Sequence, residues 1–285
     1  MLTINPRDTH TAELHAYLLS SVAPRPIALA STLDAEGRPN LSPFSFFNVF
    51  SANPPILIFS PARRVRDNTV KHTYENVKAV KEVVINVVTY DMVQQTSLSS
   101  TEYAQGVNEF EKAGFSMKAS ERVQPFRVAE SPIQFECAVR QVIELGGDGG
   151  AGNLVVCEIL LMHIDQQVLD EKGQIDQHKL DLVARAGGSF YSRARDGFFE
   201  IPKPLKSKGV GVDSLPGEVR RSRVLSGNDL GLLGNVDALP GQADVDKFMK
   251  ENPAILGMDL DEKHKFAKKL IEQNDVTGAL SALLS

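Results

Sequence analysis

The chain has 285 residues, of which 42% are hydrophobic and 24% charged, an ordinary composition for a globular protein with a sizeable core. Its formal charge of −5 comes from acidic and basic residues intermixed along the chain, and no long basic run indicates nucleic-acid binding. No stretch approaches the roughly 18 apolar residues of a membrane helix, and the polar residues 1–14 lack the apolar core of a signal peptide. We therefore expect a cytoplasmic protein with neither nucleic acid nor membrane as partner.

The cysteines and histidines give no sign of a disulfide or of a metal site. Cys137 and Cys157 both lie inside apolar runs, where a buried free thiol is the usual arrangement. The six histidines form no pair four residues apart and have no cysteine neighbours. We expect two buried free thiols and no bound metal.

The first two-thirds of the chain is predicted to be rich in β-structure. Six apolar segments are predicted as strands: 25–33, 40–50, 56–60, 83–88, 133–145 and 153–164. One helix is expected early, capped by Asp67 and with Val70, Val77 and Val80 on one face. Residues 91–120 are expected to form short helices and loops. Many strands with so few helices favour a closed or partly closed barrel over a doubly wound sheet, which needs a helix after nearly every strand.

Six segments in chain order resemble the flavin reductase-like family. They are residues 23–32 (APRPIALAST), 37–48 (GRPNLSPFSFFN), 53–55 (NPP), 66–69 (RDNT), 84–88 (VINVV) and 186–191 (AGGSFY). The resemblance covers roughly residues 10–195. It implies a mainly β fold, the split β-barrel, that binds FMN non-covalently and usually pairs as a homodimer. It says less about the reaction, because the family mixes reductases, oxygenase components and uncharacterised FMN proteins.

The turn at residues 66–69 is the segment that contacts the FMN phosphate in the family. A phosphate group needs backbone N–H donors, hydroxyls and a cation, and the N-terminus of a helix adds partial positive charge. We therefore predict Arg66 and Thr69 as phosphate ligands and Asp67 mainly as the N-cap of the following helix. A solvated loop that merely caps a helix is the structural alternative.

The run from Ser42 to Ser51 is expected to lie along the flavin ring and ribityl chain, since it mixes apolar and hydrogen-bonding residues. Phe44 and Phe47 are expected in the core instead. The candidates in this run are Ser45, Phe46, Asn48, Val49 and Ser51. Further candidates are Ser31, Thr32, Ser60 and Tyr191, although hydroxyls at strand ends often only close turns. The glycines beside Tyr191 could admit a ligand or form a bulge.

Two other features are set aside. Gly147, Gly149 and Gly152 satisfy the spacing G-x-G-x-x-G, but a predicted strand follows where the dinucleotide fingerprint requires a helix. His163 ends a predicted strand and is expected to serve packing or the surface rather than the nicotinamide pocket.

The character of the chain changes near residue 200, so we divide it into domains 1–200 and 201–285. Residues 201–241 have no clear period and suggest a linker or a wrapping segment with a solvated cluster of Lys203, Lys206 and Lys208. Three amphipathic helices are predicted at 244–251, 261–273 and 275–284. Helices this short seldom stand alone in water, so we expect them to dock on the barrel or on its mate.

The resemblance implies a flavin oxidoreductase that takes hydride from NADH or NADPH at flavin N5 and passes reduced flavin to an oxygenase or another acceptor. No catalytic residue of the protein is required, because the flavin carries the chemistry. Two alternatives stay open. The chain could be an FMN-binding electron carrier or redox sensor, or a module that has lost its flavin and acts through protein contacts.

Overall fold

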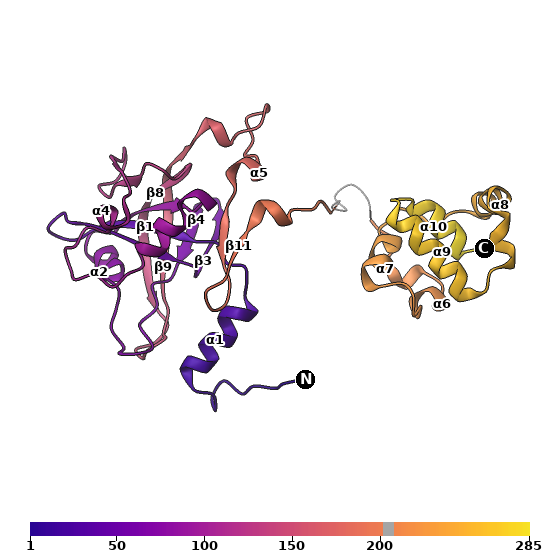
Figure 1. The fold of residues 1–285 in the computed structure, drawn as a ribbon, viewed down its shortest axis with the longest axis horizontal. Helices are drawn as coiled ribbons and strands as arrows, with labels where there is room; N and C mark the ends of the chain where they lie inside the picture. Colours follow the sequence, from indigo (N-terminus) through magenta and orange to yellow (C-terminus); the bar gives the residue numbers. More distant parts are fainter. Residues whose placement is uncertain (202–207) are drawn as a thin grey trace. The chain divides into compact units, whose positions relative to one another are not determined.

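The computed structural model describes residues 1–201 and 208–285, and the chain divides into two compact units, Met1–Phe198 and Phe199–Ser285 (Figure 1). Each unit is described by itself. Lys203 and Lys206 lie outside the described residues, whereas Lys208 is exposed. Within the described ranges, no helix combines the length and the apolar character that crossing a membrane requires.

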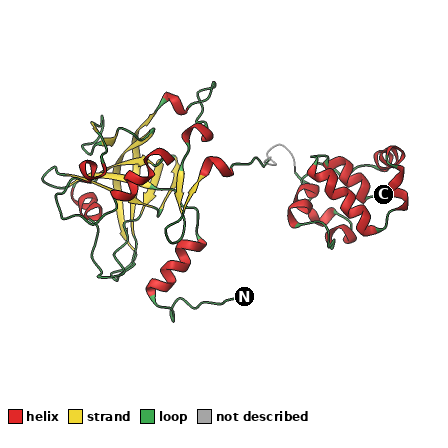
Figure 2. Ribbon diagram, in the orientation of Figure 1, coloured by secondary structure: helices red, strands yellow, loops and turns green. Residues whose placement is uncertain are grey.

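The first unit is built on one seven-stranded antiparallel sheet (Figure 2). Its order is β2-β1-β5-β8-β9-β4-β3. The strands are β1 (Ala28–Leu33), β2 (Pro39–Phe44), β3 (Phe47–Ala52), β4 (Pro55–Phe59), β5 (Glu82–Val87), β8 (Ile133–Glu144) and β9 (Asn153–Ile164). The predicted strand 40–50 is thus two strands, because the chain turns at Ser45 and Phe46 and crosses from one edge of the sheet to the other.

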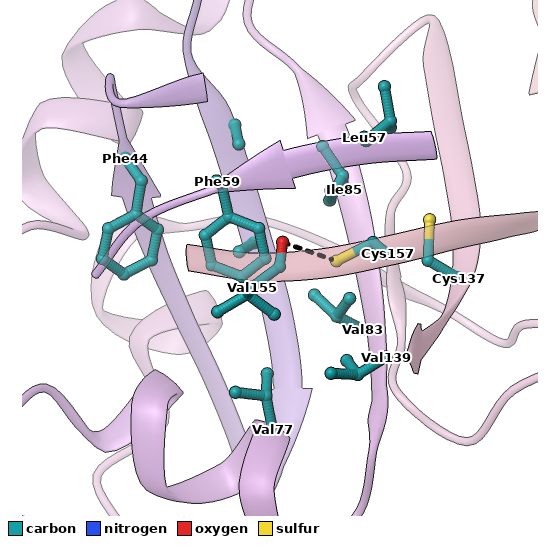
Figure 3. Packing of buried hydrophobic residues seen from close by; sticks show 12 residues of the cluster. Phe44, Leu57, Phe59, Val77, Val83, Ile85, Cys137, Val139, Val155 and Cys157 are labelled. Atoms are coloured by element: carbon teal, nitrogen blue, oxygen red, sulfur yellow. Dashed lines mark hydrogen bonds between the residues drawn. The ribbon is translucent and has the colours of Figure 1, made fainter. Parts of the chain in front are cut away.

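The sheet curls strongly. In the strand order β2 and β4 are five steps apart, which would separate them by about 24 Å in a flat sheet at ~4.8 Å per strand. Yet the rings of Phe44 on β2 and Phe59 on β4 have centroids 5.3 Å apart (Figure 3). Among the described residues no ladder joins the edge strands β2 and β3, so the sheet is curled without being closed.

Six of the seven strands contribute buried residues to the core inside the curl (Figure 3), and β3 adds the partly buried Phe47. The buried members include Ala28, Ala30, Phe44, Leu57, Phe59, Val83, Ile85, Cys137, Val155 and Cys157. Both cysteines are free and fully buried, as predicted, and burial raises the pKa of each thiol well above its ordinary value. They are therefore protonated packing groups.

Strand β1 is buried on both faces. Ala28 and Ala30 point into the curl, while Ile27 and Leu29 belong to a second cluster with Phe110 and Met92. Small helices and ribbons supply the outer layer. These are α3 (Val93–Leu98), α4 (Glu109–Ala113), α5 (Gln177–Leu180), the 3₁₀ turns η1 (Tyr90–Met92), η2 (Gln166–Val168) and η3 (Ala194–Gly197), the ribbon β6 (Met117–Lys118) with β7 (Arg127–Val128), and the ribbon β10 (Val183–Arg185) with β11 (Tyr191–Arg193).

The Arg25 side chain forms hydrogen bonds to three separate segments of the chain. Its guanidinium donates to the carbonyls of Leu19 and Val22 at the end of α1 (Thr11–Ser21), to the carbonyl of Ala186, and weakly to the Ser45 hydroxyl. Arg25 is only 6% exposed. The carbonyls at the helix end favour a cation there, and so a buried guanidinium is accommodated without a carboxylate partner.

The early helix, α2, spans His72–Ala79, and the prediction that Asp67 caps it is wrong. The Asp67 carboxylate instead accepts from the backbone N–H (3.0 Å) and the hydroxyl (2.5 Å) of Thr69. This local turn competes with the helix for the same residues, and α2 begins after Lys71 without a side-chain cap. Val77 enters the core as predicted, while Val70 and Val80 are half-buried.

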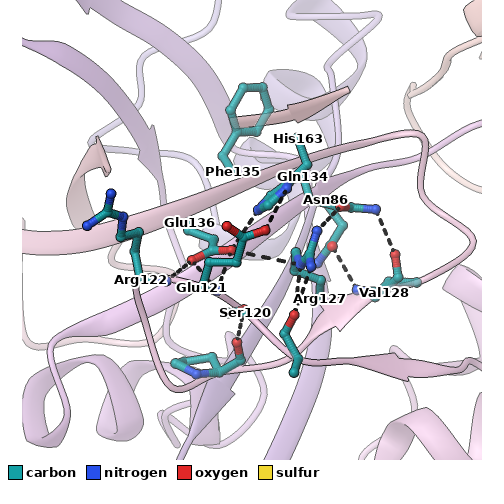
Figure 4. A network of polar contacts seen from close by, with 12 residues as sticks. Asn86, Ser120, Glu121, Arg122, Arg127, Val128, Gln134, Phe135, Glu136 and His163 are labelled. Carbon is teal, nitrogen blue, oxygen red and sulfur yellow. Dashed lines mark hydrogen bonds and ion pairs between the residues drawn. The ribbon is translucent and has the colours of Figure 1, made fainter. Parts of the chain in front are cut away.

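A buried carboxylate organises the loop before β7 (Figure 4). Glu136 is fully buried on β8, and its carboxylate accepts from the backbone N–H groups of Glu121 (3.0 Å) and Arg122 (2.6 Å). His163 on β9 lies 2.7 Å from the same carboxylate. His163 therefore serves packing within this network, as expected.

The second unit is a helical domain with a core of its own, which includes Leu215, Val219, Leu233, Ala267 and Leu280. Its elements are η4 (Val212–Ser214), α6 (Gly217–Arg220), α7 (Gly227–Gly234), α8 (Gln242–Glu251), η5 (Pro253–Gly257), α9 (Leu260–Glu272) and α10 (Val276–Leu283). The last three α-helices confirm the predicted ones. The prediction of a linker up to residue 241 is wrong, because η4, α6 and α7 form in this stretch and each contributes to the core. These elements are too short to show a helical period in the sequence.

Candidate functional site

The loop between β4 and α2 carries three arginines, Arg63, Arg64 and Arg66. Arg64 donates to the Thr69 hydroxyl (2.7 Å) and to the Val70 carbonyl (2.7 Å), and pairs with Glu102 at 2.7 Å. Arg66 also reaches Glu102, at 2.8 Å. The Glu102 carboxylate thus bridges two guanidiniums, and hydrogen bonds from both lower its pKa.

These residues border what we call the cationic groove, an open cavity of about 830 Å³. Its walls include Arg63, Arg64, Arg66, Thr69 and His72, together with the carboxylates of Asp67, Glu75 and Glu102. The predicted phosphate residues Arg66 and Thr69 therefore lie together, with Asp67 between them in the chain and hydrogen-bonded to both.

Lys71 borders a smaller cavity that adjoins the groove, together with Arg64, Ser99, Ser100 and Thr101. Burial and the neighbouring Arg64 lower the pKa of Lys71. Among the described residues no carboxylate lies within 4.0 Å of Lys71 or of Arg63. Lys71 beside the hydroxyls of the smaller cavity and Arg63 in the adjoining groove are donors of the kind that an anionic phosphate requires, while Glu102 and Glu109 also line the smaller cavity.

The glycine-rich loop at residues 146–152 supports the arginine loop through its backbone. Arg63 N–H donates to the Ala151 carbonyl (2.8 Å), and Gly150 N–H donates to the Arg63 carbonyl (3.0 Å). A Cβ placed on Gly149 would lie 3.0 Å from the Arg64 carbonyl oxygen and 3.1 Å from that of Val65. The glycine at 149 thus permits close approach of two backbones, and the spacing of these glycines has no relation to a dinucleotide.

Edge strand β3 leads away from this groove. Ser60, the first residue of the loop after β4, donates its N–H to the Phe46 carbonyl at 2.8 Å. Phe47 pairs with Phe59 at the same end of the ribbon. The arginine loop and the start of β3 are therefore neighbours, which brings together the segments predicted for the phosphate and for the ring.

Strand β3 offers both apolar and polar groups. Val49 is 63% exposed and Phe46 38%, and the Phe46 ring stands edge-on to His15 of α1. Asn48 is exposed, while Ser45 and Ser51 are half-buried. What we call the apolar slot, a cavity of about 210 Å³, is lined by residues that include Phe47, Asn48, Val49, Leu57, Phe135 and Val183. Apolar walls beside exposed polar groups suit a flat ring with hydrogen-bonding edges.

The other predicted hydroxyls lie in the interior. Thr32 accepts from the Asn76 amide (3.0 Å), and the Ser60 hydroxyl accepts from the Asn153 N–H (3.0 Å). The Ser31 hydroxyl is buried, with no hydrogen-bond partner among the described residues. Since each of these three residues is less than a tenth exposed, a ligand would reach them only if their neighbours moved.

Tyr191 lines neither the cationic groove nor the apolar slot and lies in a separate cavity with Tyr90, Arg185 and Arg193. Sequence reasoning missed Lys71, Ser99, Ser100 and Thr101, because no local pattern shows that residues 99–103 fold against the arginine loop. Arg63 and Arg64 belong to the basic run Ala62–Arg66, and the positive charge of this run is the sequence feature that could have indicated them as phosphate ligands.

Comparison with known proteins identifies the family of this chain. The profile of the flavin reductase like domain matches residues 19–181. An uncharacterized protein of Aquifex aeolicus is 34% identical over 188 residues, which cover 66% of this chain and 93% of that protein. The chain belongs to the flavin reductase-like family.

The solved structures that are similar to this chain include the following two. One is nitrilotriacetate monooxygenase component B from Bacillus cereus, with 28% identity, a TM-score of 0.66, and coverage of 70% of this chain and 98% of that one. The other is the 2-nitrobenzoate 2-nitroreductase NbaA of Pseudomonas fluorescens, with 26% identity, a TM-score of 0.63, and coverage of 73% and 100%.

Proposed function

We propose that this protein is an FMN-binding oxidoreductase of the split-barrel type that uses NADH or NADPH as donor. The observation that carries the proposal is the cationic groove at one end of β3, with the apolar slot along the same strand. The close approach of Phe44 and Phe59 supports the split barrel, because it requires a sheet curled almost onto itself.

The residues of this chain would bind and orient the flavin. Arg64, Arg66, Thr69 and Lys71 would hold the phosphate, and Lys71 is the cation of this set that has no carboxylate within 4.0 Å among the described residues. Strand β3 would line the ring with Asn48, Val49 and Ser51, and the turn before it with Ser45 and Phe46, while the walls of the apolar slot would exclude water. Bound FMN would supply the hydride acceptor, its N5 atom, so no side chain need act as acid, base or nucleophile.

A homodimer is part of the proposal. Val49 and Phe50 on β3 are each 63% exposed, and Leu160 and Met162 on β9 are 44% and 40% exposed. Apolar side chains on an edge strand favour association, and a second copy would cover them. We expect Phe50→Lys to shift the protein toward monomer in sedimentation velocity; an unchanged dimer would place the interface elsewhere, and a monomeric wild type would remove the dimer from the proposal.

The acceptor is proposed from likeness alone. The Bacillus cereus structure is of a monooxygenase component, and this likeness supports transfer of reduced flavin to a partner oxygenase. The second candidate is an electron carrier or redox sensor, in which FMN held against the apolar walls of the slot would not react with a nicotinamide. Tight FMN with negligible NADH or NADPH turnover would identify it.

The deciding experiment is a visible spectrum of the purified protein with added FMN, followed by anaerobic NADH and then NADPH. We expect a bound flavin whose band near ~450 nm bleaches with one donor. Bound flavin that neither nucleotide bleaches would favour the electron carrier. Protein that takes up no flavin would contradict the proposal and favour a module acting through protein contacts.

A further inference from the structure

The cavity that contains Tyr191 lies between η1, α3 and the β10–β11 ribbon, and we call it the tyrosine–arginine pocket. Its volume is about 420 Å³, which lies within the range of small-molecule sites. It is lined by Tyr90, Val93, Gln94, Ser97, Val183, Arg185, Ser189, Tyr191, Ser192 and Arg193. It shares Val183 with the apolar slot and no residue with the cationic groove.

Each tyrosine of the pocket carries an arginine on its ring. The Arg193 guanidinium carbon lies 3.9 Å from the centroid of Tyr90, and that of Arg185 lies 4.7 Å from the centroid of Tyr191. Tyr90 is 48% exposed and Tyr191 40%. These aromatic surfaces are fixed in orientation and accessible, so a planar ring can stack beside them at low entropic cost.

The two arginines differ in their charge balance. Arg193 pairs with Asp181, with Nη2 and Oδ2 2.5 Å apart. Among the described residues, the guanidinium of Arg185 donates to the carbonyl of Phe190 (3.1 Å) and has no carboxylate within 4.0 Å. Arg185 therefore has most of its five donors left for an anion, and the planar fork matches a phosphate or a carboxylate.

The remaining polar groups favour one class of ligand. Gln94, Ser97, Ser189 and Ser192 add an amide and three hydroxyls to the walls. A simple aromatic acid has too few hydrogen-bonding groups to use them, whereas the base, ribose and phosphate of a nucleotide have many. We infer that the tyrosine–arginine pocket binds a nucleotide, with the base against the tyrosines and a phosphate on Arg185.

Two sources share this chemistry. The nucleotide could be part of the reduced nicotinamide donor, a reading that rests on the function proposed above, or a separate effector. Binding itself does not depend on hydride transfer. The probe is therefore ADP, which cannot reduce flavin, titrated calorimetrically into the full-length protein saturated with FMN.

We expect one ADP site per chain that persists at saturating FMN. Arg185→Gln should weaken ADP binding about tenfold or more, because a charge-assisted hydrogen bond is lost. The control is Arg195→Gln. It removes the same charge from a residue ten positions further along the chain that does not line the pocket. Gln94→Ala, at an exposed side chain, gives a second variant with little risk to folding.

Each outcome decides. Displacement of ADP by FMN would place ADP in the flavin site and overturn the inference. The inference would also fail if Arg185→Gln and Arg195→Gln lost ADP affinity equally, or if no ADP bound at all. If no FMN binds, the same titration of flavin-free protein still tests the pocket, so its failure is distinct from that of the proposed function. A tenfold rise in the KM for NADH or NADPH in Arg185→Gln, at constant kcat, identifies the donor; an unchanged KM with weakened ADP identifies an effector.

Discussion

Lys71 shows how a single residue can define the candidate site. Lys71 is half-buried beside Arg64, and burial together with this arginine outweighs the opposing effect of Glu102 and lowers the pKa of the ammonium. A bound phosphate would remove the penalty. A cation held in this way indicates an anionic ligand more specifically than an exposed arginine such as Arg66, which already pairs with Glu102.

We predict that Lys71→Gln weakens FMN binding about tenfold or more, the effect of losing one charge-assisted contact. Riboflavin, which has no phosphate, should bind the variant and the wild type equally, as measured by flavin fluorescence quenching. Lys172→Gln, at an exposed turn, is the control of equal charge. Equal losses for FMN and riboflavin would contradict a phosphate role.

Glu136 makes a second residue-scale prediction. Burial alone would raise its pKa, but hydrogen bonds from the Glu121 N–H, the His163 ring and the Arg122 N–H outweigh burial and leave the pKa lowered. A carboxyl whose pKa is lower in the folded state stabilises the fold above its unfolded pKa of roughly 4.3, and the contribution is lost as the pH falls through the folded value.

Glu136→Gln should therefore flatten the loss of stability below pH ~4.3 while lowering the free energy of unfolding at pH 7 by roughly 1–3 kcal/mol. Urea unfolding at several pH values measures both effects. Glu158→Gln, at a half-buried residue whose partner Arg140 is exposed, is the control. If the variant loses stability in acid as steeply as the wild type, other carboxyl groups account for the acid sensitivity of the fold.

At the scale of elements, the arginine loop depends on the glycine-rich loop for its position. The contact joins backbone to backbone, so a side chain at Gly149 has no flexible neighbour to displace. By contrast, a Cβ on Gly147 would meet nothing within 4 Å. Gly147 and Gly149 lie in one loop, but there is space for a Cβ atom at residue 147 and none at residue 149.

Gly149→Ala should shift the arginine loop and weaken FMN binding severalfold, whereas Gly147→Ala should leave it unchanged. The comparison uses FMN titrations of both variants, with thermal unfolding to show that each is folded. Equal FMN affinity in the two variants would mean that the loop tolerates the displacement.

At the scale of the molecule, two separate cores make two folding units. The core within the curled sheet and the helical core of the second unit share no residue. Three capping boxes or side-chain caps, at Ser226, Asp259 and Asp275, fix where helices of the second unit begin. That these helices dock on the barrel or on its mate stays a prediction.

We predict that residues 208–285 alone fold into a helical domain that unfolds cooperatively with heat, because the fragment keeps its whole core. Far-UV circular dichroism measures it, and the fragment 1–201 should bind FMN as the full chain does. A fragment 208–285 without helical signal would show that the second unit needs the first. Slower proteolysis of 208–285 within the full chain than in isolation would support docking.

The sequence by itself determined the strands, the terminal helices and the family, because apolar runs, turn residues and ordered motifs are local properties. It placed Arg66 and Thr69 in one turn because they are close in the chain. Only the tertiary structure decided that residues 99–103 adjoin Lys71, that Gly149 supports the arginine loop, that Ser31, Thr32 and Ser60 are buried, and that Tyr191 belongs to another pocket. Each of these depends on how the curled sheet brings together residues far apart in the chain, which no local pattern records.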